Sequence, residues 1–181
     1  MIIDRDRSLL LVLDLQKKMV PAIHEHEQVV ANIVWLVRAA QKLGVPVAAT
    51  EQYAKGLGPT IPELRALLPD GAIGAKTKFS CVAAECLVGL PGADRAQVIL
   101  AGVETHVCLL QTALELLEEG KEVYVVADAV GSRREFDRDM ALERMRKEGV
   151  RIVTREMVVF EWLGEADTPI FRAVSKEFFR S

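Results

Sequence analysis

Three side chains in this 181-residue sequence have the types and positions that nucleophilic catalysis needs. Cys108 lies just after the apolar, β-branched run Val98–Val103 and just before a mostly apolar stretch with helical spacing. A thiol in the first turn of a helix lies near the positive end of the helix dipole. We therefore expect Thr105 to cap the helix and the thiolate of Cys108 to be favoured. Asp14 and Lys78 follow two earlier runs that are predicted to be strands.

Each of these residue types has a possible role in one reaction. A thiol is mostly protonated near pH 7, so a base such as Asp14 must take its proton and later activate a water molecule. Lys78 could hold Asp14 in an ion pair and stabilise a developing oxyanion. Ordinary structure explains the same residues as a small buried thiol, an aspartate that caps the next element and a solvated lysine. The sequence leaves both explanations open, because it does not show that the three side chains converge.

Six short apolar runs are predicted to be strands, with helices between them. The expected strands cover residues 8–13, 45–50, 73–77, 98–103, 122–127 and 151–154. Three of the expected helices end at Gly44, Gly120 and Gly149. Three shorter helices are expected at residues 62–68, 81–88 and 155–162. This alternation predicts a single α/β domain over residues 1–181. Its three layers would be a mainly parallel six-stranded sheet with helices on both faces, in a Rossmann-like arrangement.

The predicted sheet would bring the candidate chemistry to one edge. The carboxyl ends of the strands in an open parallel sheet share that edge, and ligands bind there. Asp14, Lys78 and Cys108 each follow a predicted strand, so we expect all three at this edge. Asp128 is expected to end the fifth strand at the same edge.

Composition and charge argue against several classes of protein. The formal net charge is −3, so no basic field would attract nucleic acid or an anionic membrane. The apolar run at residues 9–13 is too short to span a bilayer. The three cysteines are odd in number and lack Cys-x-x-Cys spacing, which is typical of a reducing compartment. We expect a cytoplasmic protein without a metal or other cofactor, with Cys81 and Cys86 as core residues of one helix.

Several motifs together resemble the isochorismatase-like cysteine hydrolases, most closely the branch called isochorismatase domain-containing proteins. The motifs are LDLQ at 13–16, TEQY at 50–53, KGLG at 55–58, KTKFS at 76–80, GVETHVC at 102–108 and ADA at 127–129. The resemblance implies the isochorismatase-like hydrolase fold and a catalytic triad of Asp14, Lys78 and Cys108. It also implies a cis peptide bond between Val103 and Glu104, which turns backbone N–H groups, including that of Cys108, toward an oxyanion.

Two departures from relatives narrow the predicted activity. Nicotinamidases carry an Asp-x-His metal motif where this chain has Glu51, Gln52 and Tyr53, so the resemblance implies no metal site here and disfavours nicotinamide as substrate. Isochorismatase itself works without the nucleophilic cysteine, so Cys108 favours attack on a carbonyl carbon. We therefore predict a metal-independent hydrolase that cleaves a small amide or related C–N bond through a covalent intermediate on Cys108.

A small-molecule substrate needs further contacts beside the thiol. The residues expected to provide them are Gln16, Gln52, Tyr53, Phe79 and Thr105, although ordinary packing explains several of these residues equally well. The apolar faces of the helix at 105–117 and of the amphipathic tail at 168–181 predict a homo-oligomer. In the tail, Thr168 is expected to cap a helix that begins at Pro169.

Two other functional classes fit the same sequence. One is a catalytically silent scaffold or binding protein that keeps the fold, and loss of turnover in Asp14→Asn would eliminate it. The other is a redox-sensing thiol protein, in which oxidation of Cys108 would alter assembly or binding.

Overall fold

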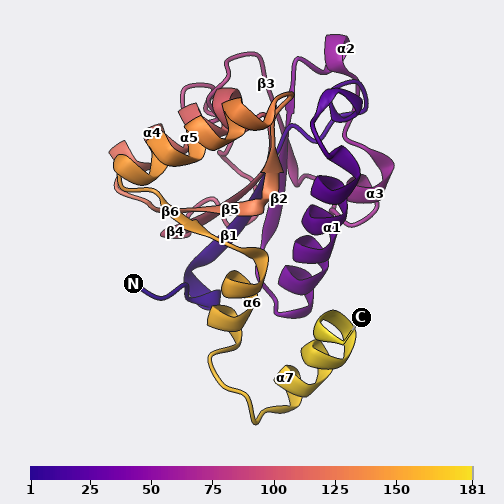
Figure 1. Cartoon of the computed structure of the whole chain (residues 1–181), viewed down its shortest axis with the longest axis vertical. Coiled ribbons are helices and arrows are strands. Elements are labelled where there is room, and N and C mark those ends of the chain that lie inside the picture. The colour runs from indigo at the N-terminus through magenta and orange to yellow at the C-terminus, as the bar shows by residue number, and fades with distance from the viewer. Residues whose placement is uncertain (181) are drawn as a thin grey trace.

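A six-stranded sheet in which every neighbouring pair of strands is parallel forms the centre of the computed structural model, which describes residues 1–180 (Figure 1). The strands are β1 (Ser8–Leu13), β2 (Val47–Gln52), β3 (Ile73–Lys76), β4 (Gln97–Val103), β5 (Glu122–Gly131) and β6 (Arg151–Val153). Their spatial order is β3-β2-β1-β4-β5-β6. The chain reverses its direction of winding between β1 and β4, and ligands bind in the crevice at such a point.

Helices cover both faces of this sheet (Figure 1). One face packs against α1 (His26–Lys42), α3 (Pro62–Arg65), α6 (Arg155–Leu163) and α7 (Pro169–Val174). The other face packs against α4 (Leu110–Glu118) and α5 (Glu135–Lys147). Every residue of β1 and β4 is buried, because these central strands have a hydrophobic layer on each side. The predicted three-layer α/β fold is confirmed.

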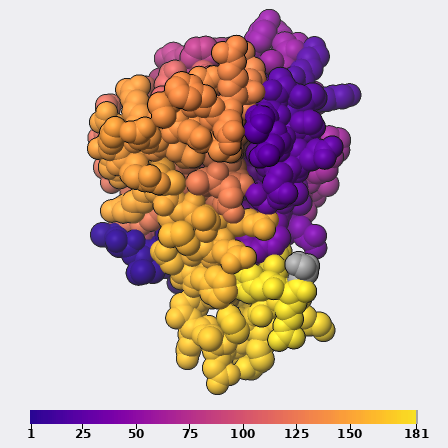
Figure 2. Space-filling model, viewed as in Figure 1, coloured from indigo at the N-terminus to yellow at the C-terminus, as the bar shows by residue number. Residues whose placement is uncertain are grey.

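Short irregular elements connect the layers at the edge where the strands end. They are the single turn α2 (Ala54–Leu57) after β2 and the π-helical turn Thr105–Leu109, which leads from β4 into α4. In Figure 1, α2 lies at the top of the molecule and α7 at the bottom, so the C-terminal segment is remote from this edge. In the space-filling view the yellow C-terminal segment forms the lower end of the molecule (Figure 2).

The C-terminal tail packs through aromatic side chains. Thr168 accepts a hydrogen bond from the N–H of Phe171, so α7 begins at Pro169 as predicted. Phe178 is buried and meets the ring of Trp35 edge-on, with 5.5 Å between ring centroids. The tail predicted at 168–181 therefore covers α1, and its last residue, Ser181, lies outside the described residues.

Two local predictions are wrong. The fifth strand does not end at Asp128, because β5 continues to Gly131 after a register shift in its pairing with β4. The helix expected at 81–88 is absent, because the chain leaves the helical path after one turn, where Glu85 has a left-handed backbone conformation with φ of 54°. Among residues 1–180, the longest apolar helices still fall short of what crossing a membrane requires.

Candidate active site

Asp14 lies directly after β1, at the crevice between β1 and β4. Its φ is 54°, a left-handed conformation that aspartate tolerates better than most residues. Asp14 is only 1% exposed, and its carboxylate accepts hydrogen bonds from two side chains. Thr50 Oγ1 donates to Oδ1 at 2.7 Å, and Lys76 Nζ donates to Oδ2 at 2.8 Å. Asp14 is thus a buried acceptor with a fixed orientation.

Lys76, the last residue of β3, supplies the positive charge next to Asp14. Its side chain is fully buried, and its ammonium also donates to Gln52 Oε1 at 2.7 Å. Burial alone would lower the pKa of Lys76, but the neighbouring Asp14 carboxylate outweighs it, so the pKa is raised. The pair is therefore a lysine ammonium and an aspartate held together without solvent.

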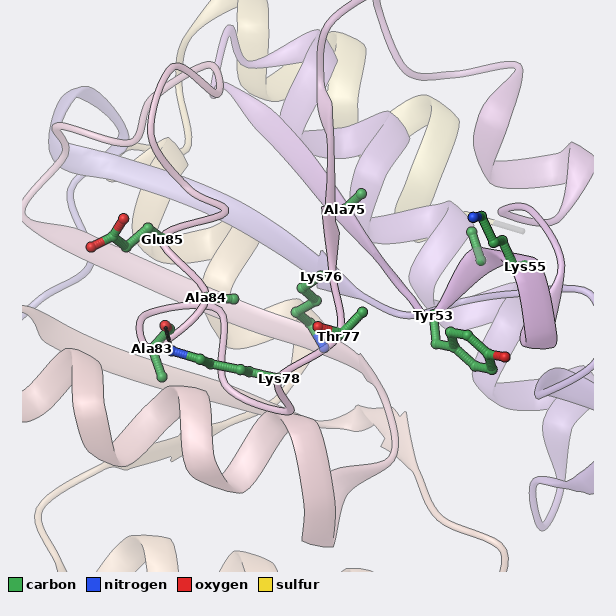
Figure 3. Close-up of a pocket in the computed structure, with 10 residues that line it drawn as sticks. Tyr53, Lys55, Ala75, Lys76, Thr77, Lys78, Ala83, Ala84 and Glu85 are labelled. Carbon is green, nitrogen blue, oxygen red and sulfur yellow. Dashed lines mark hydrogen bonds between the residues drawn. The ribbon is translucent and has the colours of Figure 1, made fainter.

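The predicted ion pair between Lys78 and Asp14 is wrong. Lys78 is exposed, and its ammonium donates to the carbonyl of Ala83 at 2.8 Å, as Figure 3 shows. In the same view Lys76 lies apart from this contact. The physical reason is that β3 ends at Lys76 and the chain then turns, so Lys78 no longer continues the alternation of the strand.

Cys108 enters the site from the π-helical turn after β4. It is 6% exposed, and its pKa is raised to about 12. Burial is the largest cause, and the Asp14 carboxylate adds to it, whereas the Lys76 ammonium acts in the opposite direction. The expectation that the helix start favours the thiolate is therefore wrong. Thr105 does not cap the helix: its hydroxyl is buried and has no hydrogen-bond partner among the described residues.

A cavity of about 230 Å³ is lined by both Asp14 and Cys108. Its walls are mostly apolar, and its lining residues are Asp14, Met19, Gln52, Tyr53, Leu57, Phe79, Val103, Glu104, Val107 and Cys108. Two residues expected to contact a substrate do not line it. Gln16 is buried outside it, with its amide bonded to the backbone of Gln52 and Gly58. Thr105 is buried and is not among the lining residues.

The backbone beside Cys108 has an unusual course. The peptide bond between Val103 and Glu104 is cis. The Glu104 carbonyl accepts hydrogen bonds from the N–H groups of Val107 and Leu109, and the intervening N–H of Cys108 is left out of that pair. The Glu104 carboxylate accepts a bond of 2.9 Å from Arg133. These contacts hold the turn that carries the thiol.

Figure 3 shows an open depression of about 760 Å³, which shares the lining residue Tyr53 with the smaller cavity. Its polar lining residues include Lys55, Lys78 and Glu85. Within residues 1–180, no group of three or more His, Cys, Asp or Glu side chains is arranged to hold a metal ion.

The sequence matches a known protein family over most of its length. The model of the isochorismatase domain matches residues 8–157. The chain belongs to the isochorismatase family. It is 43% identical to isochorismatase domain-containing protein 2 of Danio rerio over 172 residues, which are 93% of this chain and 85% of that protein. The resemblance stated from the motifs is therefore confirmed.

Solved structures of similar proteins have the same fold. The MAR1 ribonuclease of Caenorhabditis elegans has a TM-score of 0.88 and 38% identity, over 100% of this chain and 94% of that one. The YcaC gene product of Escherichia coli, described as an octameric hydrolase of unknown specificity, has a TM-score of 0.88 and 27% identity. That match covers 98% of this chain and 90% of YcaC. This member of the isochorismatase family thus resembles proteins described as hydrolases.

Sequence reasoning missed two residues of the site in this family member, Lys76 and Thr50. Lys76 lies inside the third strand predicted at 73–77, so a lysine inside a strand was the available signal. Thr50 ends the predicted second strand and is paired with Leu13, next to Asp14. Gln52 was expected to contact substrate, and its bond to Lys76 had no signal in the sequence.

Proposed function

We propose that this protein is a cysteine hydrolase that cleaves a small amide or related C–N bond without a metal. Cys108 is the nucleophile, Asp14 the base and Lys76 the charged partner. The observation that carries the proposal is the ion pair of Lys76 and Asp14, with side chains 0% and 1% exposed, in which Asp14 lines the same cavity as the Cys108 thiol. Burying two charges is costly, and perturbed groups of this kind cluster at functional sites.

The first half of the reaction starts from a neutral thiol, because the pKa of Cys108 is raised to about 12. As Sγ attacks the carbonyl carbon of the substrate, the thiol proton passes to the Asp14 carboxylate. Lys76 keeps its charge throughout, so the site is never left with an unbalanced anion. Backbone N–H groups around Val103–Glu104 and Cys108 would hold the oxyanion. The tetrahedral intermediate then collapses, and Asp14 gives its proton to the departing nitrogen.

The second half returns the enzyme to its starting state. The acyl group is now a thioester on Cys108, and the ionised Asp14 takes a proton from a water molecule. The resulting hydroxide attacks the thioester carbon, the carbon–sulfur bond breaks, and the proton on Asp14 returns to sulfur. The sum is hydrolysis of one C–N bond by one water molecule.

The cavity indicates the kind of substrate. Its volume of about 230 Å³ is below the roughly 300–1,000 Å³ of pockets that hold drug-sized ligands. Its walls include Phe79 and Leu57, and the polar residues in its lining besides Asp14 and Cys108 are Gln52, Tyr53 and Glu104. A compact amide with an apolar acyl group fits this combination, with Tyr53 orienting its polar end.

The test is a panel of small amides and carbamoyl compounds, together with single-stranded RNA. RNA is included because the Caenorhabditis elegans relative is named a ribonuclease. We expect turnover of one class of amide that Cys108→Ala and Lys76→Met abolish and that Lys78→Met leaves intact. Cys108-dependent cleavage of RNA without amide turnover would replace this proposal, and turnover that survives Cys108→Ala would refute it. If no compound in the panel is turned over, the alternative function of a catalytically silent scaffold or binding protein would be favoured.

The same family likeness supports a homo-oligomer. The YcaC structure is described as octameric, and it covers nearly the whole of this chain. We propose that this protein also self-associates, and light scattering at micromolar concentration would test it. A monomer under those conditions would contradict the proposal.

A further inference from the structure

Cys81 and Cys86 lie at the two ends of one helical turn. The turn begins at Ser80, whose hydroxyl accepts hydrogen bonds from the N–H groups of Val82 and Ala83. It ends where Glu85 adopts the left-handed conformation. This turn replaces the helix that the sequence predicts at 81–88.

The hydrogen bonds at the end of the turn define a Schellman motif. The N–H of Cys86 donates to the carbonyl of Cys81 at 3.2 Å, and the N–H of Glu85 donates to the carbonyl of Val82 at 2.8 Å. In this motif the side chains at the two positions joined by the longer bond commonly touch. Here those positions are both cysteines. The backbone geometry therefore brings two thiols together, although four residues lie between them in sequence.

Neighbouring elements fix the turn in place. The Cys81 N–H donates to Thr112 Oγ1 at 3.1 Å, and Ser80 Oγ donates to a carboxylate oxygen of Glu115 at 2.6 Å, so α4 holds one side. On the other side Lys78 donates to the Ala83 carbonyl, which the short helical turn leaves without a partner inside the turn. The lysine that does not reach Asp14 thus stabilises the cysteine turn.

The two thiols differ in environment. Cys81 is fully buried, whereas Cys86 is half-buried. The hydrogen bond from Cys81 lowers the pKa of Cys86, and that bond together with burial raises the pKa of Cys81. Cys81 also lines a separate cavity of about 290 Å³ between the turn, the sheet and α4, large enough for small solutes. A small oxidant can therefore reach Cys81 through this cavity and the half-buried Cys86 from solvent.

We propose that Cys81 and Cys86 form a site of reversible oxidation, in which hydrogen peroxide converts them to an intramolecular disulfide. The Cys86 thiolate attacks one peroxide oxygen, the O–O bond breaks, and a sulfenic acid and hydroxide form. The Cys81 thiol then attacks the sulfenic sulfur, the disulfide bond forms, and water leaves. Two electrons pass from the two thiols to the peroxide, and the overall products are one disulfide and two water molecules.

Cys81 and Cys86, and not Cys108, are therefore the residues proposed for redox sensing. The sequence pointed to Cys108, but a cysteine reacts with peroxide as the thiolate, so its rate depends on the fraction that is ionised. The pKa of Cys108 is raised to about 12, so it has little thiolate at neutral pH. The dithiol reacts first, and Cys108 is spared at low peroxide concentration.

The test exposes the full-length protein to increasing hydrogen peroxide at pH 7.5, blocks the remaining thiols and digests with trypsin. Both cysteines lie in the single tryptic peptide of residues 79–95, because Lys78 and Arg95 flank it. We expect this peptide to appear two hydrogens lighter than its reduced form, and dithiothreitol to reverse the change. The Cys108 peptide should stay reduced until higher peroxide concentrations.

Variants at Glu85 test whether the Schellman motif, and not chance proximity of the two thiols, promotes the disulfide. Glycine adopts the left-handed conformation readily, so Glu85→Gly should form the disulfide at the wild-type rate. Valine disfavours that conformation, so Glu85→Val should slow disulfide formation about tenfold. Cys81→Ser should leave Cys86 open to over-oxidation. Peroxide that oxidises Cys108 first, or that over-oxidises wild-type Cys86 without a disulfide, would overturn the proposal. An unchanged rate in Glu85→Val would do the same.

Discussion

Removal of the Asp14 carboxylate should make Cys108 more reactive as a thiol while abolishing hydrolysis. At a pKa of about 12, roughly one thiol in 10⁵ is ionised at pH 7. In Asp14→Asn burial still raises the pKa of Cys108, but the nearby anion is gone and the Lys76 ammonium remains, so the pKa should fall below its value of about 12. Each unit of that fall raises the thiolate fraction about tenfold. The lower basicity of the thiolate reduces its nucleophilicity about threefold per unit, which leaves a net gain of about threefold per unit.

The assay measures exchange of Cys108 with methyl methanethiosulfonate, a disulfide-forming reagent small enough for the cavity. Peptide mass spectrometry follows Cys81, Cys86 and Cys108 separately in the same sample. The matched control is Asp128→Asn, which makes the same change in a carboxylate outside the cavity. Its Cys108 should react at the wild-type rate.

One result would refute the reasoning. If folded Asp14→Asn exchanges Cys108 at the wild-type rate or more slowly, the Asp14 carboxylate is not what keeps the thiol protonated. Asp14 would then have to act on the substrate or on water alone. Circular dichroism and urea unfolding of the variant would establish that it is folded.

Four further outcomes are expected. Lys76→Met leaves the buried Asp14 carboxylate without its positive partner and should lower the free energy of unfolding in urea by about 3–5 kcal/mol. Substitution of the exposed lysine, Lys78→Met, should change that free energy by at most about 0.5 kcal/mol. Equal effects of the two substitutions would contradict the assignment of the ion pair. Gln52→Leu removes the bond to the Lys76 ammonium and should lower kcat about tenfold with little change in KM; a change confined to KM would mean that Gln52 only binds substrate. Gly102→Ala should prevent stable folding, because the added Cβ would lie 2.2 Å from the Leu13 carbonyl at φ of 116°, and a wild-type melting temperature would disprove this. Finally, unfolded Cys108 loses its proton near pH 9 and folded Cys108 only near pH 12, so the free energy of unfolding should fall as pH rises through this range. The fall should be smaller in Cys108→Ala, and urea titrations at several pH values can measure the difference.

Much of the fold follows from local patterns. The first strand was predicted with its observed bounds, because β1 is a continuous apolar run between polar residues. The positions of Asp14 and Cys108 at one edge then followed from parallel strands alone. These predictions needed only hydrophobic pattern and topology.

The choice between the two lysines needed more than pattern. Lys76 and Lys78 are two residues apart, so they share the same side of an extended strand, and alternation cannot distinguish them. The decision depends on where β3 ends, which is set by the cysteine turn and its contacts with α4. The same turn defeated the helix prediction at 81–88. The helical turn ends because Glu85 has a left-handed backbone conformation. Glutamate has no special preference for that conformation, so long-range contacts, and not the local sequence, determine where the turn ends.

The origin of the site residues also bears on how such a protein can change. Asp14, Thr50, Lys76 and Cys108 come from the ends of four adjacent strands, whereas cavity walls such as Phe79 come from the connecting segments. Substitutions in those segments alter the shape of the cavity without breaking the sheet or the buried charges. Selection for a new substrate can therefore act on the loops while the chemical groups stay fixed. For an engineer, the same separation makes the loop positions the first to randomise.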